Sequence, residues 1–396
     1  MSDPTETNPS DTAQIETAQP ENDLAALRTA LDLVDADLVD VVARRLSLVS
    51  QVGDLKSGAS GSIRDAARER EVLDAAAAAA RARGVSVHLV RRLFEELLHH
   101  SVTHQVARLA PSDGRLLRVS YQGAENAYSY LAAHKHVDDA GAVGEFVGCR
   151  TFREAAVLLT DGDVDLAVLP IENTTAGSIN GVYDVLRTED LTIVGEEVWK
   201  VDHCLAGPVD VPIESLTRVL SHPQALEQCS TFLATLPHCE AVAHVDTAAA
   251  LEAVAAAGDP TVAAIGSTEA ATALGLVVLR HGVSNQQENY TRFVVLATEP
   301  RAVDPRVPCK TSLILVTRHE QGALLRCLEV LAASGLSMTK LESRPRPSRP
   351  FEYMFFLDFE GSVDDPRVGA AIEELRMAAL MVKVLGSYPS KTVVRS

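Results

Sequence analysis

Apolar residues recur every three or four positions from residue 21 to about residue 109, which is the spacing of amphipathic helices. The first stretch, "LAALRTALDLVDADLVDVVARRLSLVSQVGDLK", contains no proline and ends at "SGASGS", residues 57–62. A second helix is predicted over residues 63–83 and a third over residues 86–108. The pattern therefore predicts an all-α domain of three helices over residues 21–110.

After "PSDG" at residues 111–114, short apolar runs alternate with helical segments. The runs that indicate strands are "LLRVSYQG", "VDLAVLPIEN", "TIVGEEVW", "TRVLSHPQ", "VAAIGS" and "NYTRFVVLAT". Strands that alternate with helices over so long a stretch are typical of α/β domains. Residues 115–300 are therefore predicted to form an α/β domain large enough for two lobes.

A third pattern covers residues 310–390. Strand "TSLILVT", helix "GALLRCLEVLAAS", strands "SMTKLES" and "EYMFFLDFEG", helix "PRVGAAIEELRMA" and strand "MVKVLGSY" follow one another. This βαββαβ order predicts a ferredoxin-like α+β domain. Its small size favours a regulatory or pairing module. The chain as a whole is thus predicted to be a multidomain protein.

Composition narrows the classes of partner. A chain of 396 residues is too long for one ordinary core, so several domains are expected. A net charge of −18 argues against nucleic acid and against an anionic membrane surface as the main partner. No apolar run approaches the roughly 20 residues that span a bilayer. Small anions stay possible ligands, because they need only a local cluster of basic residues.

The first twenty residues are polar, acidic and interrupted by proline, and we interpret them as a disordered tail rather than a signal peptide. The six cysteines lie far apart and include no C-x-x-C pair. This spacing favours reduced thiols in a cytoplasmic protein over a disulfide framework or a metal site, and no metal is expected.

Polar residues of the helical domain form spaced sets. They are Arg28, Arg45, Lys56, Asp65, Arg68, Glu69, Ser101 and Gln105. Each alone fits a solvated helix face. Arg45 and Lys56, however, share one face of a helix about 16 Å apart, whereas Arg28 lies about 25 Å from Arg45. Arg28 therefore reaches the same small ligand only if a second chain supplies it.

In identity and spacing these eight residues resemble the active site of the all-helical chorismate mutases. The resemblance implies an intertwined dimer in which Arg28 comes from the partner. It implies that Arg28, Arg45 and Arg68 hold carboxylates of chorismate, and that Lys56 and Gln105 face the ether oxygen. Glu69 and Asp65 are then expected on the side of the ring hydroxyl. The rearrangement needs no nucleophile, so confinement and placed charges supply the catalysis.

Four segments gather small polar residues after predicted strands: "YQGAENAYS", "PIENTTAGS", "SHPQAL" and "NYTRF". Each has an ordinary alternative, since Ser, Thr and Asn cap helices and proline suits a first helical turn. In α/β folds, however, ligands sit beyond the carboxyl ends of strands. Together the four segments predict one ligand cleft, and the hydroxyls of "PIENTTAGS" are expected both to bind an anion and to cap a helix.

These segments resemble those of prephenate dehydratases. The resemblance implies a fold like that of type II periplasmic binding proteins, with Thr291 of "NYTRF" as the residue most tied to catalysis. We expect Thr291 to donate an oriented hydrogen bond to the departing hydroxyl, with His222 as the titratable alternative. The expected substrate-binding residues are Asn173, Thr174, Thr175, Ser178, Ser221, Gln224 and Arg292. One departure is Asn126 in place of a usual glycine, at a turn where Asn tolerates a left-handed backbone.

The last domain carries "GALL", whose first residues are Gly322, Ala323 and Leu324, and "ESRP", which is Glu342, Ser343, Arg344 and Pro345. Both resemble the phenylalanine-binding motifs of ACT domains, although a loop glycine and a solvated surface explain them equally well in isolation. A glycine at the start of a helix permits close backbone approach by an amino-acid ligand. Phenylalanine is therefore the expected effector.

The combined resemblance predicts a cytoplasmic homodimer or larger homo-oligomer that converts chorismate to prephenate and prephenate to phenylpyruvate, without a cofactor. One rival joins the mutase to a prephenate dehydrogenase, but no G-x-G-x-x-G follows a strand. The other rival is a non-catalytic sensor of aromatic amino acids. The full set of polar residues in the helical domain counts against a sensor.

Overall fold

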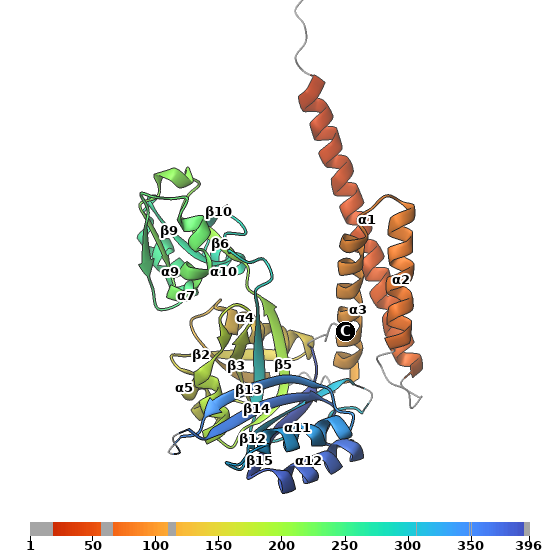
Figure 1. The fold of residues 1–396 in the computed structure, drawn as a ribbon. Coiled ribbons are helices and arrows are strands. Elements are labelled where there is room, and N and C mark those ends of the chain that lie inside the picture. The colour runs from red at the N-terminus through yellow and green to blue at the C-terminus, as the bar shows by residue number, and fades with distance from the viewer. Residues whose placement is uncertain are drawn as a thin grey trace, which may run out of the picture. The chain divides into compact units, whose positions relative to one another are not determined.

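The computed structural model describes residues 19–56, 66–109, 116–305, 307–347, 349 and 351–391 (Figure 1). Its contacts divide the chain into two compact units, of which the first ends at Ala59 and the second begins at Ser60. The predicted breaks at residues 57–62 and 111–114 lie outside the described residues. None of the helices in the described ranges is both long and apolar enough to span a bilayer.

The first unit contains α1 (Gln19–Lys56), one continuous helix of 38 residues. The predicted tail lies outside the described residues up to position 18, and Gln19 and Pro20 already belong to this helix. The early start is possible because proline lacks the N–H that is unsatisfied in a first helical turn. The first predicted helix is therefore confirmed.

The second unit begins with α2 (Ala66–Ala82) and α3 (Val87–Leu109), which confirm the other predicted helices of the all-α domain. Gly84 takes a left-handed backbone between them, with a φ of 68°. Ser86 then caps α3, because its hydroxyl accepts a hydrogen bond from the amide of Leu89 at 3.4 Å.

The predicted α/β domain has two lobes, each built on its own sheet. The first sheet has the order β2-β1-β3-β11-β5, with β4 beside β3. Its strands are β1 (Leu116–Gln122), β2 (Val143–Cys149), β3 (Leu166–Asn173), β4 (Gly177–Ser178), β5 (Thr192–Lys200) and β11 (Tyr290–Ala297). Its helices are α4 (Tyr128–Asp139), α5 (Phe152–Thr160) and α6 (Asn180–Thr188). β11 runs antiparallel to both of its neighbours, β3 and β5.

The second lobe lies between β5 and β11 in the sequence, so the chain crosses to it after β5 and returns before β11. Its sheet has the order β10-β6-β9-β7-β8. The strands are β6 (His203–Gly207), β7 (Arg218–Ser221), β8 (Glu240–Ala243), β9 (Val262–Ser267) and β10 (Val277–Arg280). The helices are η1 (Ile213–Ser215), α7 (Pro223–Gln228), α8 (Ser230–Leu233), α9 (Thr247–Ala257) and α10 (Thr268–Ala273).

The C-terminal domain follows the predicted βαββαβ order, and its antiparallel sheet has the order β13-β14-β12-β15. Its elements are β12 (Cys309–Val316), α11 (Ala323–Ala333), β13 (Met338–Pro345), β14 (Tyr353–Glu360), α12 (Pro366–Ala378) and β15 (Met381–Pro389). Leu313 and Leu315 of β12 share a core with residues of α11 and α12, whereas Ile314 and Val316 join the core of the first lobe. This alternation follows from the two-residue period of a strand.

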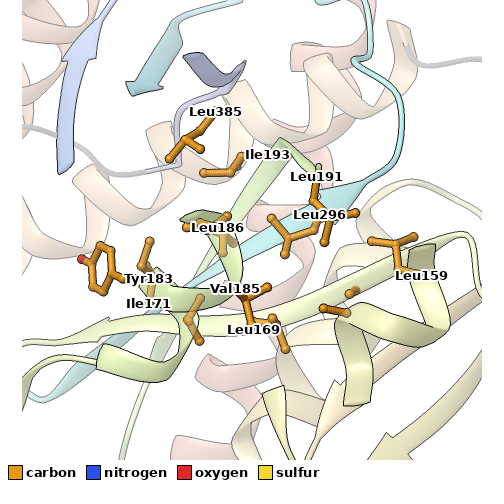
Figure 2. Close-up of a cluster of buried hydrophobic side chains, with 14 of the residues drawn as sticks. Leu159, Leu169, Ile171, Tyr183, Val185, Leu186, Leu191, Ile193, Leu296 and Leu385 are labelled. Carbon is orange, nitrogen blue, oxygen red and sulfur yellow. The ribbon is translucent and has the colours of Figure 1, made fainter. Parts of the chain in front are cut away.

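Part of the contact between the first lobe and the C-terminal domain is apolar and closely packed. Figure 2 shows Tyr183 and Leu186 of α6, Ile193 of β5 and Leu385 of β15 in one buried cluster. At Gly386 a Cβ atom would lie 2.1 Å from the carbonyl oxygen of Ile193, so only glycine fits there. The central strand β12 is thus buried on both faces, by the helices of its own domain and by the first lobe, whereas alternate residues of β13 are exposed.

Candidate functional sites

The residues of the predicted mutase site lie on all three helices of the helical part. Arg28 and Arg45 lie within α1, and Lys56 is its last residue. Because α1 is continuous, the 1.5 Å rise per residue places Arg28 about 25 Å from Arg45 along the axis. Arg28 is exposed, whereas Arg45 is half-buried, and this burial lowers the pKa of the Arg45 guanidinium.

The other members of this set divide between α2 and α3. Arg68 is exposed and forms an ion pair with Glu71 at 2.8 Å, and Glu69 beside it is half-buried. Ser101 is buried in α3 and donates its hydroxyl hydrogen to the carbonyl of Leu97. Gln105 lies in the last part of α3, and Asp65 lies outside the described residues.

A cavity of about 530 Å³ lies where loops of the first lobe meet α7 and α8 of the second. Its lining residues are Thr175, Ala176, Gln224, Glu227, Gln228, Ser230, Ser284, Asn285, Gln286 and Asn289. Side-chain amides and hydroxyls dominate this lining, and among the described residues that form it Glu227 alone is charged. The cavity can therefore hold a polar ligand through neutral hydrogen-bond donors.

Thr291 is tied to this cavity by a chain of amide hydrogen bonds. The side-chain nitrogen of Asn173 donates to the Thr291 hydroxyl oxygen at 3.0 Å and to the side-chain oxygen of Asn289 at 2.7 Å. Asn289, which lines the cavity, donates in turn to Gln228 at 3.3 Å. Because the Thr291 oxygen already accepts a bond from Asn173, its hydroxyl hydrogen can be donated to a ligand.

The chain of hydrogen bonds continues to His203, a buried residue that sequence reasoning missed. Its Nε2 lies 3.1 Å from the Gln228 side-chain oxygen, and its Nδ1 lies 3.1 Å from the Tyr128 hydroxyl. Burial lowers the pKa of His203, so the neutral ring donates from Nε2 and accepts at Nδ1. In the sequence, the signal is a histidine at the start of the short buried strand "HCLAG".

The prediction that the hydroxyls of "PIENTTAGS" cap a helix is wrong. The helix α6 begins later, at Asn180, and its N-cap residue, Ile179, makes no side-chain capping bond. Instead Asn173 closes a turn, because its side-chain oxygen accepts bonds from the amides of Thr175 and Ala176 at 3.0 and 2.8 Å. Asparagine closes such a turn readily because its side chain reaches the backbone amides two residues on.

The predicted binding residues of this loop take separate places. Thr175 lines the cavity. Thr174 instead fastens the loop to β11, because its hydroxyl accepts from the amide of Tyr290 at 2.9 Å. Ser178 belongs to β4 and pairs with Glu172. The loop therefore presents Thr175 to the cavity and uses Asn173 and Thr174 to hold its own shape.

The "SHPQ" segment divides in the same way. Gln224 lines the cavity, and its role as a substrate ligand stays a prediction. Ser221 is fully buried and donates its hydroxyl to the carbonyl of Ile265 at 2.7 Å, which contradicts its prediction as a substrate ligand. His222 caps α7, because its Nδ1 accepts a bond from the amide of Gln224 at 3.3 Å. A capping role of His222 is therefore favoured over the role of an acid.

Arg292 is turned away from the cavity, which contradicts the prediction that it holds a substrate carboxylate. Successive side chains of a strand point to opposite faces, so Arg292 and Thr291 of β11 cannot both face one ligand. The guanidinium donates to Glu172 and Glu196 at 2.8 Å each and to the Tyr388 hydroxyl at 2.9 Å. Burial alone lowers its pKa, but this ring of partners raises the pKa of Arg292 well above its ordinary value.

Asn126 occupies the left-handed turn predicted for it, with a φ of 65°. It lies between β1 and α4, one residue before the N-cap of that helix, Ala127. The asparagine thus supplies the backbone conformation that glycine adopts without cost.

The predicted effector motifs lie at two places in the C-terminal domain. Gly322 has a φ of 76° and precedes α11, where Ala323 is buried and Leu324 packs against the core. In β13, Arg344 donates to the side-chain oxygen of Asn180 at 2.6 Å, whereas Ser343 is exposed. Two further motif residues, Glu342 and Pro345, also lie in β13.

Comparison with known proteins assigns the chain to a class. Residues 27–106 match the family model of chorismate mutase type II, and residues 119–301 match that of prephenate dehydratase. A bifunctional chorismate mutase/prephenate dehydratase of Enterobacter agglomerans is 39% identical over 95% of this chain and 98% of its own length. The chain therefore belongs to the bifunctional chorismate mutase/prephenate dehydratase family.

Two solved structures each resemble about two thirds of the chain. One, described as a quorum-quenching acylase, GqqA, is 32% identical with a TM-score of 0.62 and covers 69% of this chain and 98% of its own. The other is a prephenate dehydratase of Arthrobacter aurescens in complex with L-Phe, 24% identical with a TM-score of 0.63. It covers 69% of this chain and 90% of its own, and it supports the fold.

Proposed function

We propose that the helical part converts chorismate to prephenate and that the two-lobed domain converts prephenate to phenylpyruvate, with loss of water and CO2. Membership of the bifunctional family carries this proposal, and the cavity between the two lobes is the proposed place of the second step. A ligand there meets amides and hydroxyls from both lobes. The Thr291 hydroxyl, held by Asn173 at 3.0 Å, is the donor for the departing hydroxyl group.

The mutase half requires a second copy of the chain. Apolar residues recur along α1 at alternating spacings of four and three residues and so form a stripe on one face of the helix. Each of these apolar residues is more than 45% exposed. The apolar members of the stripe are Leu27, Leu31, Val34, Leu38, Val41, Leu48 and Val52. Arg45 occupies the remaining place of this stripe, between Val41 and Leu48. A second protomer whose α1 covers the stripe in antiparallel orientation would bring its Arg28 toward Arg45, which answers the separation of about 25 Å within one helix.

The C-terminal domain is proposed to be an ACT domain with a ferredoxin-like fold that binds phenylalanine. The βαββαβ order and the left-handed Gly322 at the start of α11 support this assignment. The relative from Arthrobacter aurescens, whose structure contains L-Phe, supports phenylalanine as the effector. An effector inhibits only if it binds two states of the protein with different affinity.

One experiment tests the proposed function. Purified protein receives chorismate without any cofactor, and prephenate and phenylpyruvate are followed over time, with and without phenylalanine. Lys56→Ala is expected to lower the mutase kcat strongly and to leave prephenate turnover intact. Thr291→Val is expected to do the reverse, so prephenate accumulates. A protein that binds these compounds without converting them contradicts the proposal and favours a sensor.

A further inference from the structure

The strands that carry the dehydratase site also face the C-terminal domain. In the antiparallel pair β3 and β11, Thr291 is opposite Asn173, and Arg292 is opposite Glu172. Side chains alternate between the faces of a sheet, so these neighbouring pairs point in opposite directions. Thr291 and Asn173 belong to the site, and Glu172 and Arg292 belong to the contact with the C-terminal domain.

Glu172 and Arg292 are held by residues of that domain. Lys340 of β13 forms an ion pair with one oxygen of Glu172, whose other oxygen lies 2.8 Å from Arg292. Arg292 also lies 2.7 Å from Asp358 of β14 and donates to the hydroxyl of Tyr388 at 2.9 Å. Both strands of the site are therefore fastened to the C-terminal domain through charged atoms.

The charges of this cluster balance. Lys310 of β12 lies 3.0 Å from both oxygens of Glu196, which also accepts from Arg292. The cluster consists of the cations Arg292, Lys310 and Lys340 and the anions Glu172, Glu196 and Asp358. Withdrawing one partner from a buried cluster leaves another charge uncompensated, which is strongly unfavourable. A shift of β13 or β14 must therefore move Glu172 and Arg292 with it.

Lys340 shares its strand with the predicted effector motif. Its ammonium lies 5.4 Å from the ring centre of Tyr183, and the Arg344 guanidinium lies 5.7 Å from the same centre. Arg344 also bonds Asn180, the first residue of α6. The strand that carries the "ESRP" motif, β13, thus contacts α6, which follows Asn173 in the chain.

We propose that Glu172 and Arg292 are positioning residues, through which the C-terminal domain controls the placement of Asn173 and Thr291. This inference rests on the proposed dehydratase activity. It adds that the activity depends on a contact outside the cavity, made by Lys340.

The test compares two lysines of the same interface in the full-length chain. Lys340→Met removes one of the two cations that contact Glu172. Lys383→Met is the matched control. Lys383 also extends from the C-terminal domain to the first lobe, but it donates to the backbone carbonyls of Leu186 and Glu189, at 3.3 and 2.9 Å, and not to a carboxylate. For each variant, kcat and KM for prephenate, phenylalanine inhibition, mutase activity and Tm are measured. Lys340→Arg serves as the conservative variant.

Lys340→Met is expected to lower the dehydratase kcat by roughly 2- to 30-fold, with KM within about twofold, and to weaken phenylalanine inhibition. Lys340→Arg should recover most of that kcat, and Lys383→Met should change it less than twofold, whatever its loss of Tm. Wild-type kcat in Lys340→Met, or an equal loss in Lys383→Met, overturns the inference. If Lys340→Met does not fold, Lys340→Gln against Lys383→Gln decides by the same criteria. Absence of prephenate turnover in the wild type refutes the proposed function instead.

Discussion

The variant Thr291→Val tests whether the Thr291 hydroxyl takes part in catalysis or only stabilises the fold. Valine has nearly the shape of threonine, so the change removes the hydroxyl and leaves the packing. Asn173 loses the acceptor at 3.0 Å but keeps Asn289 at 2.7 Å and the Tyr290 carbonyl at 3.3 Å. The expected loss of stability is therefore only about 1 kcal/mol.

The expected effect on turnover is larger. A preorganised donor to a departing group is worth about 10²- to 10³-fold in kcat, equivalent to about 3–4 kcal/mol of transition-state stabilisation. The assay follows phenylpyruvate from prephenate, with urea unfolding and mutase activity measured on the same preparation. Thr311→Val is the control, because it removes a buried hydroxyl in β12 of the C-terminal domain, which donates to the Gly361 carbonyl at 2.7 Å. A dehydratase kcat within tenfold of wild type, or a parallel loss of mutase activity, refutes the reasoning.

Three further predictions concern the rest of the chain. Arg28→Ala and Arg45→Ala should each inactivate the mutase. A randomised mixture of the two variant chains should recover about a quarter of wild-type activity, because half of the dimers are mixed and one of the two sites in each mixed dimer keeps both arginines. Absence of recovery argues against a site shared between chains. Glu197 is buried between His136, Lys135 and Lys391, and although burial raises its pKa, these partners lower it from 4.5 to about 2. The ionised Glu197 therefore stabilises the fold by about 3 kcal/mol above its unfolded-state pKa, and this stabilisation is lost as the pH falls toward 2. In urea unfolding, Glu197→Gln should be less stable than wild type by that amount at pH 7 and nearly equal to it near pH 2. A stability difference that does not depend on pH contradicts this assignment. Gly386→Ala should lower the free energy of unfolding by about 1–3 kcal/mol, because its Cβ would lie 2.1 Å from the Ile193 carbonyl oxygen. In the control Gly369→Ala the new Cβ would lie 3.8 Å from its nearest atom, so the free energy of unfolding should change little. Equal stability of the two variants refutes the close packing at Gly386.

Secondary structure follows closely from the sequence where apolar periodicity is strong. The predicted helix over "PRVGAAIEELRMA" coincides with α12, which proline starts and the aspartate before it caps. The run "VAAIGS" coincides with β9, whose residues are all buried. The strands β2, β6, β8 and β10 are not among the predicted runs, and three of them, β6, β8 and β10, have only four or five residues each.

The candidate site was predictable at the level of segments but not of side-chain direction. Gln224 and Thr175 reach the cavity, whereas Ser221 in the same segment as Gln224 bonds within the core. The two-residue period of β11 already excludes a shared ligand for Thr291 and Arg292. The role of His203 depends on Gln228 and Tyr128, which come from distant segments of the chain, and only the fold brings them together.

The most direct test of the central claim is a crystal structure of Thr291→Val soaked with prephenate, which this variant should bind without rapid turnover. We expect the ring in the cavity lined by Thr175, Gln224 and Asn289, with the carbon that bears the hydroxyl facing position 291. A ligand bound elsewhere, or one whose carboxylate contacts Arg292, would contradict the account.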